Sequence, residues 1–464
     1  MGAESVSTSD MSSILAGALR ATPGVSAWRV AVTRHEEAQL YLIGAREEAR
    51  RVVTDERAQL TLHNLHTPHA ADPEAGASLA LGATTFTALP GEVADPAALA
   101  ARLRDATLMA SLTDNQPFAL PAPPAAGYPA IEAFDPELAG DMTAALARAA
   151  DDLRAALSQT SGVRLGSAEL FATRAHETFQ TSAGVNTTSA STSVFFDMAL
   201  LAGEGAHAAE VHVELRRRRL RDLAFSRPVA AYGAFARHSL NAAPPSSWRG
   251  PVVVSGEAAA QLFNPLFFQA SPFVGHSSAE FKRQGMSRFV PGEFVTPEEP
   301  RGDRLTLISD PTRPWGVRTA PYDNDGTPAT RVTLIADGVF QQYWADARYA
   351  SYLDLAPTGD IGNLTVGLGT TTERELRATG AGPLYEIVAF SWFNPDPIIG
   401  DFSAEIRLGY RHDAQGVTPI KGGALVGNLF AAFSDARFSI EPFTDGIYYG
   451  PAAIRFADLT IAGV

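Results

Sequence analysis

The sequence predicts an α+β protein, with a mixed N-terminal α/β layer domain followed by a strand-rich C-terminal domain. Two observations indicate this fold class. Short alternating apolar runs follow one another before the first amphipathic helix, unlike the regular alternation of a parallel α/β sheet. From Leu305 onward, strand patterns separated by Gly, Asp and Pro turns dominate. The 464 residues suffice for two to three domains, and we divide the chain into 1–225 and 226–464.

The first expected elements are strands and one capped helix. Strands are expected at 28–33, 39–43, 50–54, 59–62 and 78–89. A charged turn, His35-Glu36-Glu37, is expected to join the first two. Asp95 followed by Pro96 is typical of a helix N-terminus. The apolar face of that helix consists of Leu99, Leu103, Ala106 and Ala110. A proline-rich connection follows at 113–130.

A second Asp-Pro pair, Asp135-Pro136, is expected to open a long helix that packs against a sheet. Its apolar stripe consists of Leu138, Met142, Ala145, Leu146, Ala149, Leu153 and Leu157. Strands are then expected at 163–173, 177–181, 194–200 and 210–215, and a helix at about 222–243. The short strand Val252–Val254 leads into a helical segment, Gly256–Gln269.

The stretch after residue 300 combines two strands with an acidic loop. The strands are expected at Leu305–Ser309 and Thr330–Ala336, and Asp337-Gly338 after the second is typical of a hairpin turn. Between them, Pro321–Pro328 reads PYDNDGTP, in which prolines stiffen the loop and Gly326 suits a positive φ. The loop therefore holds carboxylates out from a sheet. Later strands are expected at 385–393, 402–408, 417–420 and 453–461.

Composition narrows the function classes. Hydrophobic residues make up 45% of the chain and charged residues 19%, which is ordinary for a globular protein. A net charge of −14 disfavours a nucleic-acid surface, which needs clustered positive charge. No apolar run is long enough for a membrane span, and the first residues lack the pattern of a signal peptide. Because the chain has no cysteine, it has no disulfide or thiolate ligand, and a cytoplasmic location is expected.

Motifs recur in a fixed order through the second half. They begin with Asp310-Pro311, the PYDNDGTP loop and Asp337-Gly338. They continue through Asn394-Pro395-Asp396, Gly400-Asp401-Phe402-Ser403, Gly409-Tyr410, Lys421-Gly422 and Gly427-Asn428, and end with Leu459–Gly463. This order resembles the TldD/PmbA family, cytosolic proteins long called modulators of DNA gyrase and now regarded as peptidases. The resemblance extends over about two-thirds of the chain.

The resemblance implies a zinc site that this sequence lacks. The family's catalytic branch carries H-E-x-x-x-H on the helix after the strand matched by Val252–Val254, and a cysteine near the C-terminus. The matching helix here reads GEAAAQLFNPLFFQ, and no histidine occurs between His238 and His276. Alanine, leucine and phenylalanine do not bind zinc. The chain therefore resembles the PmbA (TldE) branch, the non-catalytic partner, and we predict no metal, no cofactor and no catalytic residue of its own.

Other candidate sites have plainer interpretations. His63, His66 and His69 are spaced by three, which places successive side chains on opposite faces of a strand. An exposed polar loop is therefore expected there, not a metal site. His176-Glu177 lacks a second histidine at a helical spacing. The basic run Arg216–Arg219 is expected to be a solvated edge between a strand and a helix.

The resemblance and the polarity of the turns suggest residues that contact substrate. The candidates are Asp323, Asn324, Asp325, Gly326, Asn394, Asp401 and Asn428. The acidic loop lacks the regular oxygen spacing of a calcium site, so a structural or substrate-facing role is the better interpretation.

Three functions are compatible with this pattern. The resemblance implies the non-catalytic subunit of a heterodimeric metallopeptidase, in which a zinc-bearing TldD-like paralogue supplies the chemistry. This chain would complete a chamber for unfolded peptide or peptide-like substrates, held through main-chain hydrogen bonds. The alternatives are a stand-alone, metal-independent family member acting on a peptide-like natural product, and a non-enzymatic scaffold or binding protein. Self-association stays open beside pairing with the paralogue.

Overall fold

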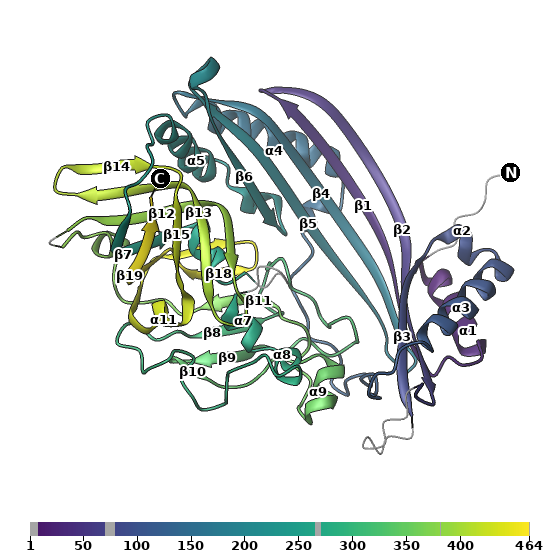
Figure 1. Ribbon diagram of the computed structural model, residues 1–464. Helices are drawn as coiled ribbons and strands as arrows, with labels where there is room; N and C mark the ends of the chain where they lie inside the picture. The colour runs from purple at the N-terminus through teal and green to yellow at the C-terminus, as the bar shows by residue number, and fades with distance from the viewer. Residues whose placement is uncertain (1–7, 70–78, 265–270, 381, 464) are drawn as a thin grey trace.

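The computed structural model describes residues 8–69, 79–264, 271–380 and 382–463, and these residues form an α+β fold, as predicted (Figure 1). Their strands make three sheets, in the orders β3-β2-β1-β4-β5-β6, β10-β9-β8-β11-β18-β17 and β12-β7-β19-β15-β13-β14, with β16 beside β19. No helix within these ranges has both the length and the apolarity to cross a membrane.

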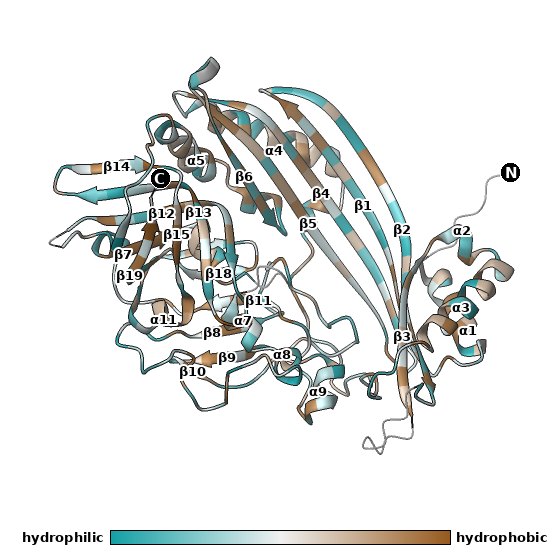
Figure 2. Cartoon of the chain, viewed as in Figure 1, coloured by the Kyte–Doolittle hydropathy of each residue, from teal (hydrophilic) through white to brown (hydrophobic). Residues whose placement is uncertain are grey.

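Long antiparallel strands that curve together form the N-terminal half (Figure 1). The strands are β1 (Ala27–Ile43), β2 (Arg46–His66), β3 (Ala80–Ala88), β4 (Val163–Thr181), β5 (Asn186–Ala202) and β6 (Ala209–Arg217). The helices are α1 (Thr8–Ala21), α2 (Pro90–Val93), α3 (Pro96–Ala110), α4 (Met142–Ser158) and α5 (Ser226–Ser239). Hydrophobic and hydrophilic residues alternate along the strands (Figure 2). One face of the sheet is therefore apolar and the other polar.

The helices cover the apolar face in two clusters. Near one end, α1 and α3 bury Val30 and Val32 of β1, and further along β1 Leu40 packs with α4 and α5. Val229 of α5 belongs to this second cluster, so α5 packs with the N-terminal sheet although it begins at Ser226. The polar face is left free to face the C-terminal half.

The expected strand breaks in this sheet are wrong. The charged turn His35-Glu36-Glu37 is instead the middle of the continuous strand β1. It stays extended because its charges are paired across the sheet: Arg174 of β4 forms an ion pair with Glu36, and Thr173 donates a hydrogen bond to Glu37 at 2.8 Å. The breaks expected in β2 at 55–58 and in β4 at 174–176 are also absent, and β5 begins at Asn186, before the strand expected at 194–200.

The two Asp-Pro signals have different outcomes. Asp95 caps α3 as predicted, and its Oδ1 accepts hydrogen bonds from the main-chain N–H groups of Ala97 and Ala98. Asp135 begins only a short 3₁₀ turn, and α4 starts at Met142, where Asp141 provides the cap. The helix expected at 222–243 is the shorter α5, preceded by a 3₁₀ turn at Leu220–Leu223.

The C-terminal half packs two sheets around one large apolar core. The strands are β7 (Trp248–Ser255), β8 (Leu307–Asp310), β9 (Val332–Ala336), β10 (Val339–Phe340), β11 (Asn363–Val366), β12 (Leu384–Pro395), β13 (Asp401–Asp413), β14 (Gly416–Ile420), β15 (Ala424–Asn428), β16 (Ala436–Phe438), β17 (Pro442–Asp445), β18 (Tyr448–Pro451) and β19 (Ala453–Ala462). The helices are α6 (Glu257–Gln261), α7 (Pro272–His276), α8 (Ala279–Arg283), α9 (Ala347–Leu353), α10 (Glu373–Leu376) and α11 (Leu429–Ala432). The hairpin turn predicted at Asp337-Gly338 is confirmed, with φ of 50° and 78°. The helix expected at Gly256–Gln269 is confirmed over α6, while 265–270 lie outside the described residues.

Arg218 and Arg219 join the two halves, so the expected solvated edge is wrong for these two residues, whereas Arg216 is exposed. Arg218 is partly buried and donates hydrogen bonds to the carbonyl groups of Gly316, Val317 and Thr319 at 3.1, 2.8 and 3.1 Å. Its neighbour Arg219 lies 4.3 Å from the ring centroid of Trp315. A guanidinium carries five donors, which suits it to hold several carbonyl groups at once. These contacts of Arg218 and Arg219 fix the segment 315–319, which leads into the acidic loop.

Candidate functional site

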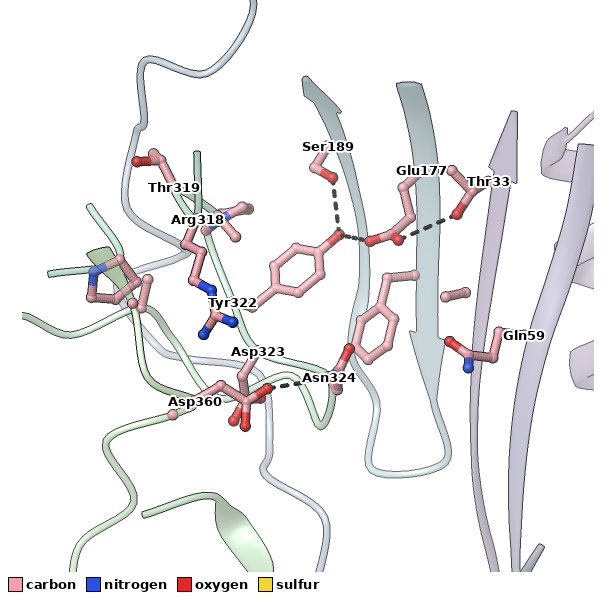
Figure 3. Close-up of a pocket in the computed structure, with 18 of the residues that line it drawn as sticks. Thr33, Gln59, Glu177, Ser189, Arg318, Thr319, Tyr322, Asp323, Asn324 and Asp360 are labelled. Atoms are coloured by element: carbon pink, nitrogen blue, oxygen red, sulfur yellow. Dashed lines mark hydrogen bonds between the residues drawn. The ribbon is translucent and has the colours of Figure 1, made fainter. Parts of the chain in front are cut away.

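A cavity of about 810 Å³ lies between the polar face of the N-terminal sheet and loops of the C-terminal half (Figure 3). The sheet contributes polar side chains that all point the same way from neighbouring strands, including Thr33, Gln59, Thr61, Thr87, Glu177 and Ser189. The facing wall consists of segments 318–324 and 358–362. A large cleft with convergent polar groups between two structural units is the usual setting of a binding site.

The acidic loop forms its own compact turn. Asp323 Oδ1 accepts hydrogen bonds from the main-chain N–H groups of Asp325 at 2.9 Å and Thr327 at 2.8 Å. Gly326 has a φ of +90°, and a Cβ there would lie 3.1 Å from a ring atom of Phe179. A side chain at this position would therefore be both strained and crowded. The predicted requirement for glycine is confirmed, and the loop is rigid by construction.

Tyr322 attaches the loop to the sheet. Its ring stacks on Phe179 of β4, with ring centroids 5.0 Å apart and an interplanar angle of 22°. Its hydroxyl group donates to Glu177 Oε1 at 2.9 Å, as Figure 3 shows. From the other side, Tyr128 of the proline-rich connection donates to the carbonyl oxygen of Gly326 at 2.9 Å. Aromatic packing and hydrogen bonds therefore fix the carboxylates with respect to the sheet.

A second attachment comes from the start of β1. Arg29 donates to the carbonyl oxygen of Asn324 at 2.7 Å and forms an ion pair with Asp325. The pair is largely buried, since the side chains keep 25% and 14% of their exposure. Such an ion pair depends on both partners, because loss of one leaves a poorly solvated charge. Asp325 is thereby occupied by the protein itself.

Asp323 is the carboxylate that remains available. Burial raises its pKa to about 7, and the negative charges of Asp360 and Asp325 add to the effect, against the N–H donors of the loop. Its Oδ2 atom is buried and has no hydrogen-bond partner within the described part of the chain. Figure 3 shows Asp323 and Asp360 side by side, with Arg318 directed toward them. Here one carboxyl oxygen can accept or release a proton near neutral pH.

A smaller cavity of about 270 Å³ lies behind the loop. Asp346 lines it, and burial raises the pKa of this residue to about 6. His63 also lines it and is only 5% exposed, so the expectation of an exposed loop is wrong for this residue. Burial, together with the positive charges of Arg29 and Arg348, lowers the pKa of His63 to about 4. The imidazole is therefore neutral, and it contacts Phe118 edge-on at 5.6 Å between ring centroids.

The structure separates the candidates suggested by the sequence into two groups. Asp323 and Asn324 line the large cavity and Asp325 the smaller one, with Gly326 in the turn between them and the sheet. Asn394, Asp401 and Asn428 lie where β12, β13 and β15 meet, and none of them lines either cavity. Asn428 there donates to Asp401 Oδ1 at 2.8 Å and caps α11. These groups complete a structural corner.

Other residues of the site carry no local motif. Arg29 and Glu177 come from strands of the N-terminal half, and Arg318, Asp346 and Asp360 from loops of the C-terminal half. The alternation along β1 and β4 places the two strand residues on the polar face, which is the one signal that points to them. Their meeting with the loops depends on how the halves pack.

The helix that follows β7 does not have the chemistry of a zinc site. In α6, Glu257 Oε2 accepts a hydrogen bond from Tyr232 at 3.2 Å, and Oε1 accepts one from Gln261 at 3.2 Å. Ala258 and Ala259 are buried in the core. Zinc sites in proteins use imidazole, thiolate and carboxylate ligands, and among the described residues no group of three such ligands includes Glu257.

Comparisons with known proteins give one matching family model and two distant curated relatives. Residues 247–463 match the family model described as PmbA/TldA metallopeptidase C-terminal domain. An uncharacterised protein of Methanocaldococcus jannaschii is 25% identical over 199 residues, which are 41% of this chain and 45% of that protein. Metalloprotease PmbA of Escherichia coli O157:H7 is 24% identical over 201 residues, 42% of each chain. The chain thus spans less than half the length of these curated relatives.

The fold extends the similarity to the whole chain. The crystal structure of TldE from Thermococcus kodakarensis superposes with a TM-score of 0.75, covering 98% of this chain and 100% of that one. Sequence identity over this match is 16%, so the likeness is one of fold.

Proposed function

The chain belongs to the PmbA/TldD metallopeptidase family, and from this premise we propose that it is a peptide-binding subunit without its own zinc chemistry. A zinc-bearing TldD-like paralogue supplies hydrolysis in this proposal. This chain contributes one wall of a chamber for unfolded peptide or peptide-like substrates.

The observation that carries the proposal is the cavity between the polar sheet face and the acidic loop. An extended peptide presents N–H and C=O groups along its whole length. The threonine, serine and glutamine side chains of the sheet can pair with both kinds of group, while Asp323 Oδ2 offers an unused acceptor. Contacts of this kind tolerate many peptide sequences, because they engage the main chain.

Lack of a catalytic role is supported by the donor set at α6. Gln261 and the alanines are not among the usual zinc ligands, and Glu257 is engaged by Tyr232 and Gln261. The cavity has an ordered set of polar groups although α6 lacks zinc ligands. This combination favours a binding role over loss of all function.

Mixing experiments test this division of labour. Cleavage of an unstructured peptide is measured for this chain, for the zinc-bearing paralogue from the same source, and for both together. We expect peptide cleavage only in the mixture, or a cleavage rate in the mixture far above that of either chain alone. A paralogue whose activity the mixture leaves unchanged would contradict the proposal.

Direct binding tests the site itself. A fluorescent unstructured peptide is titrated into the chain at pH 8, with fluorescence anisotropy as the readout. We expect Asp323→Asn to weaken binding by about tenfold, because a hydrogen bond to a charged acceptor contributes about 1.5–3 kcal/mol. Glu405→Gln, an exposed change on β13 away from the cavity, serves as the control. Equal affinity of Asp323→Asn and the parent would remove Asp323 from the site.

A second candidate function rests on the same carboxyl group. With a pKa of about 7 and a free Oδ2, Asp323 can act as a general base at neutral pH in a metal-independent reaction on a peptide-like compound. Turnover by this chain alone, with chelator present and rising with pH through about 7, would support this alternative over the first.

A further inference from the structure

We propose that His66, His69 and Asp114 bind a divalent transition-metal ion of the zinc class. Within the described residues they are the one group of three potential ligands whose donor atoms all lie within 4.8 Å of one another. The site is distinct from the cavity and from α6, and it does not depend on the function proposed above.

The spacing of the donor atoms fits a small tetrahedral ion. Asp114 Oδ1 lies 3.0 Å from His66 Nε2 and 3.1 Å from His69 Nδ1. In a tetrahedral zinc site with Zn–N distances of about 2.0–2.1 Å, neighbouring donor atoms are about 3.3 Å apart. An ion bound among these atoms therefore requires little movement of the side chains. A water molecule completes the coordination, as in other three-ligand sites.

The hydrogen bonds around His66 favour an ion in this position. Its Nδ1 lies 3.1 Å from the carbonyl oxygen of Asn64, which can only accept, so Nδ1 carries the hydrogen. Nε2 of a neutral ring then directs a lone pair at a carboxylate oxygen. Such a contact needs a cation between the atoms, either a second proton or a metal ion. A backbone carbonyl that fixes the far nitrogen is also the usual partner of a metal-bound histidine.

A main-chain hydrogen bond also orients the Asp114 carboxylate toward the two imidazoles. Its Oδ2 accepts a hydrogen bond from the main-chain N–H group of His69 at 2.9 Å, which leaves Oδ1 facing both imidazoles. The His66 and His69 rings are 5.3 Å apart between centroids. Spacing along the sequence suggested that these histidines diverge, but β2 ends at His66 and the chain then turns. The third ligand comes from the segment after α3, which sequence spacing cannot reveal.

A bound ion links two parts of the N-terminal half. It joins the end of β2 to the chain that follows α3, where Asn115 accepts a hydrogen bond from Arg348 at 2.9 Å and pairs with Leu81. Asn115 and Arg348 both line the smaller cavity. The expected role is therefore a clamp at the edge of this cavity, and binding to the folded state alone raises thermal stability.

Zinc titration of the metal-free, tag-free chain tests the proposal. Isothermal titration calorimetry is expected to give one ion per chain, and Co²⁺ is expected to give the intense visible absorption of a tetrahedral site. His66→Ala, His69→Ala and Asp114→Asn should each weaken binding at least tenfold. His212→Ala is the matched control, because His212 forms a surface pair with Glu210 at 2.6 Å that has no third ligand among the described residues.

Thermal unfolding provides a second readout. Zinc is expected to raise the unfolding temperature of the parent and of His212→Ala, and to leave the three ligand variants unchanged. His69 and Asp114 are exposed and His66 is only partly buried, so circular dichroism should show all variants folded. Failure of the parent to bind zinc would overturn the proposal and assign the cation between the imidazoles and Asp114 to a proton. Equal binding by Asp114→Asn would overturn it as well.

Discussion

Two carboxyl groups in this protein, those of Glu386 and Asp323, have opposite surroundings. Glu386 on β12 is 4% exposed and accepts hydrogen bonds from Ser255 at 2.7 Å, Arg377 at 2.8 Å and His412 at 3.1 Å. Burial alone would raise its pKa, but the hydrogen bonds from His412 and Arg377 and the charge of Arg377 outweigh it and lower the pKa to about 2. Asp323 has like charges beside it, and its pKa rises to about 7.

This difference distinguishes polar groups that only stabilise the fold from polar groups that could bind a ligand. At Glu386, both oxygens are engaged, so the fold leaves nothing for a ligand. At Asp323, the loop engages Oδ1 and leaves the buried Oδ2 without a hydrogen-bond partner among the described residues. An unpaired buried acceptor costs stability, so a water molecule, a ligand or a proton is expected to complete it.

The largest effect is expected from Glu386→Gln. Removal of one partner from a buried, hydrogen-bonded ion pair strands the other charge, and we expect a loss of about 3 kcal/mol in the free energy of unfolding at pH 7. Urea unfolding measures it, with Glu405→Gln on β13 as the exposed control. A change below about 0.5 kcal/mol would show that the network contributes no net stability.

The pH dependence of this effect has a definite sign. Glu386 has a lowered pKa, so its contribution is present above its usual pKa of 4.5 and is lost as the pH falls toward about 2. The stability gap between the parent and Glu386→Gln should therefore narrow in acid.

A smaller effect of opposite sign is expected from Asp323→Asn. Because the folded-state pKa of Asp323 is raised, the folded parent binds a proton more tightly than the unfolded chain, and its stability falls as the pH rises from about 4 to about 7. The variant lacks this titration and keeps the Oδ1 acceptor. It should be as stable as the parent at pH 4 and more stable at pH 8.

Chemical unfolding at several pH values measures the effect, with the exposed Asp105→Asn on α3 as the control. A parent and an Asp323→Asn variant whose stabilities differ equally at all pH values would contradict the raised pKa. It would also weaken the case for Asp323 as a proton-exchanging group.

Local features of the site could be predicted from the sequence, but the way in which distant residues meet there could not. Proline, glycine and aspartate spacing predicted the turn at Pro321–Pro328, because those residues restrict the backbone directly. Arg29 and Glu177 were missed, since their roles come from strands far away in the sequence that meet the loop only in the folded chain. The Arg216–Arg219 run was misjudged for the same reason, as its carbonyl partners lie about 100 residues on.

Strand boundaries in the N-terminal sheet show a second limit. Charged residues such as Glu36 interrupt the hydrophobic pattern and look like turns. In the structure Glu36 is tolerated because Arg174, its cross-strand neighbour on β4, forms an ion pair with it. Cross-strand pairing is a tertiary property, so a single-sequence pattern divides one long strand into two.

The smallest effect is expected from Asn428→Ala, at the corner that the sequence also suggested as a substrate contact. Asn428 accepts a hydrogen bond from the N–H group of Ala431 at 3.0 Å and donates to the carbonyl oxygen of Ile399 and to Asp401 Oδ1, both at 2.8 Å. Its side-chain oxygen and nitrogen are thus engaged, as at Glu386, but at a half-buried position where water can replace the lost partners. Loss of a helix cap costs about 1 kcal/mol, and we expect that decrease in the free energy of unfolding measured with urea.

The affinity for peptide, measured by fluorescence anisotropy, should stay that of the parent, because the corner lies outside both cavities. Weakened peptide binding with unchanged stability would instead make Asn428 a substrate contact, and full engagement by the fold would no longer separate structural from functional polar groups.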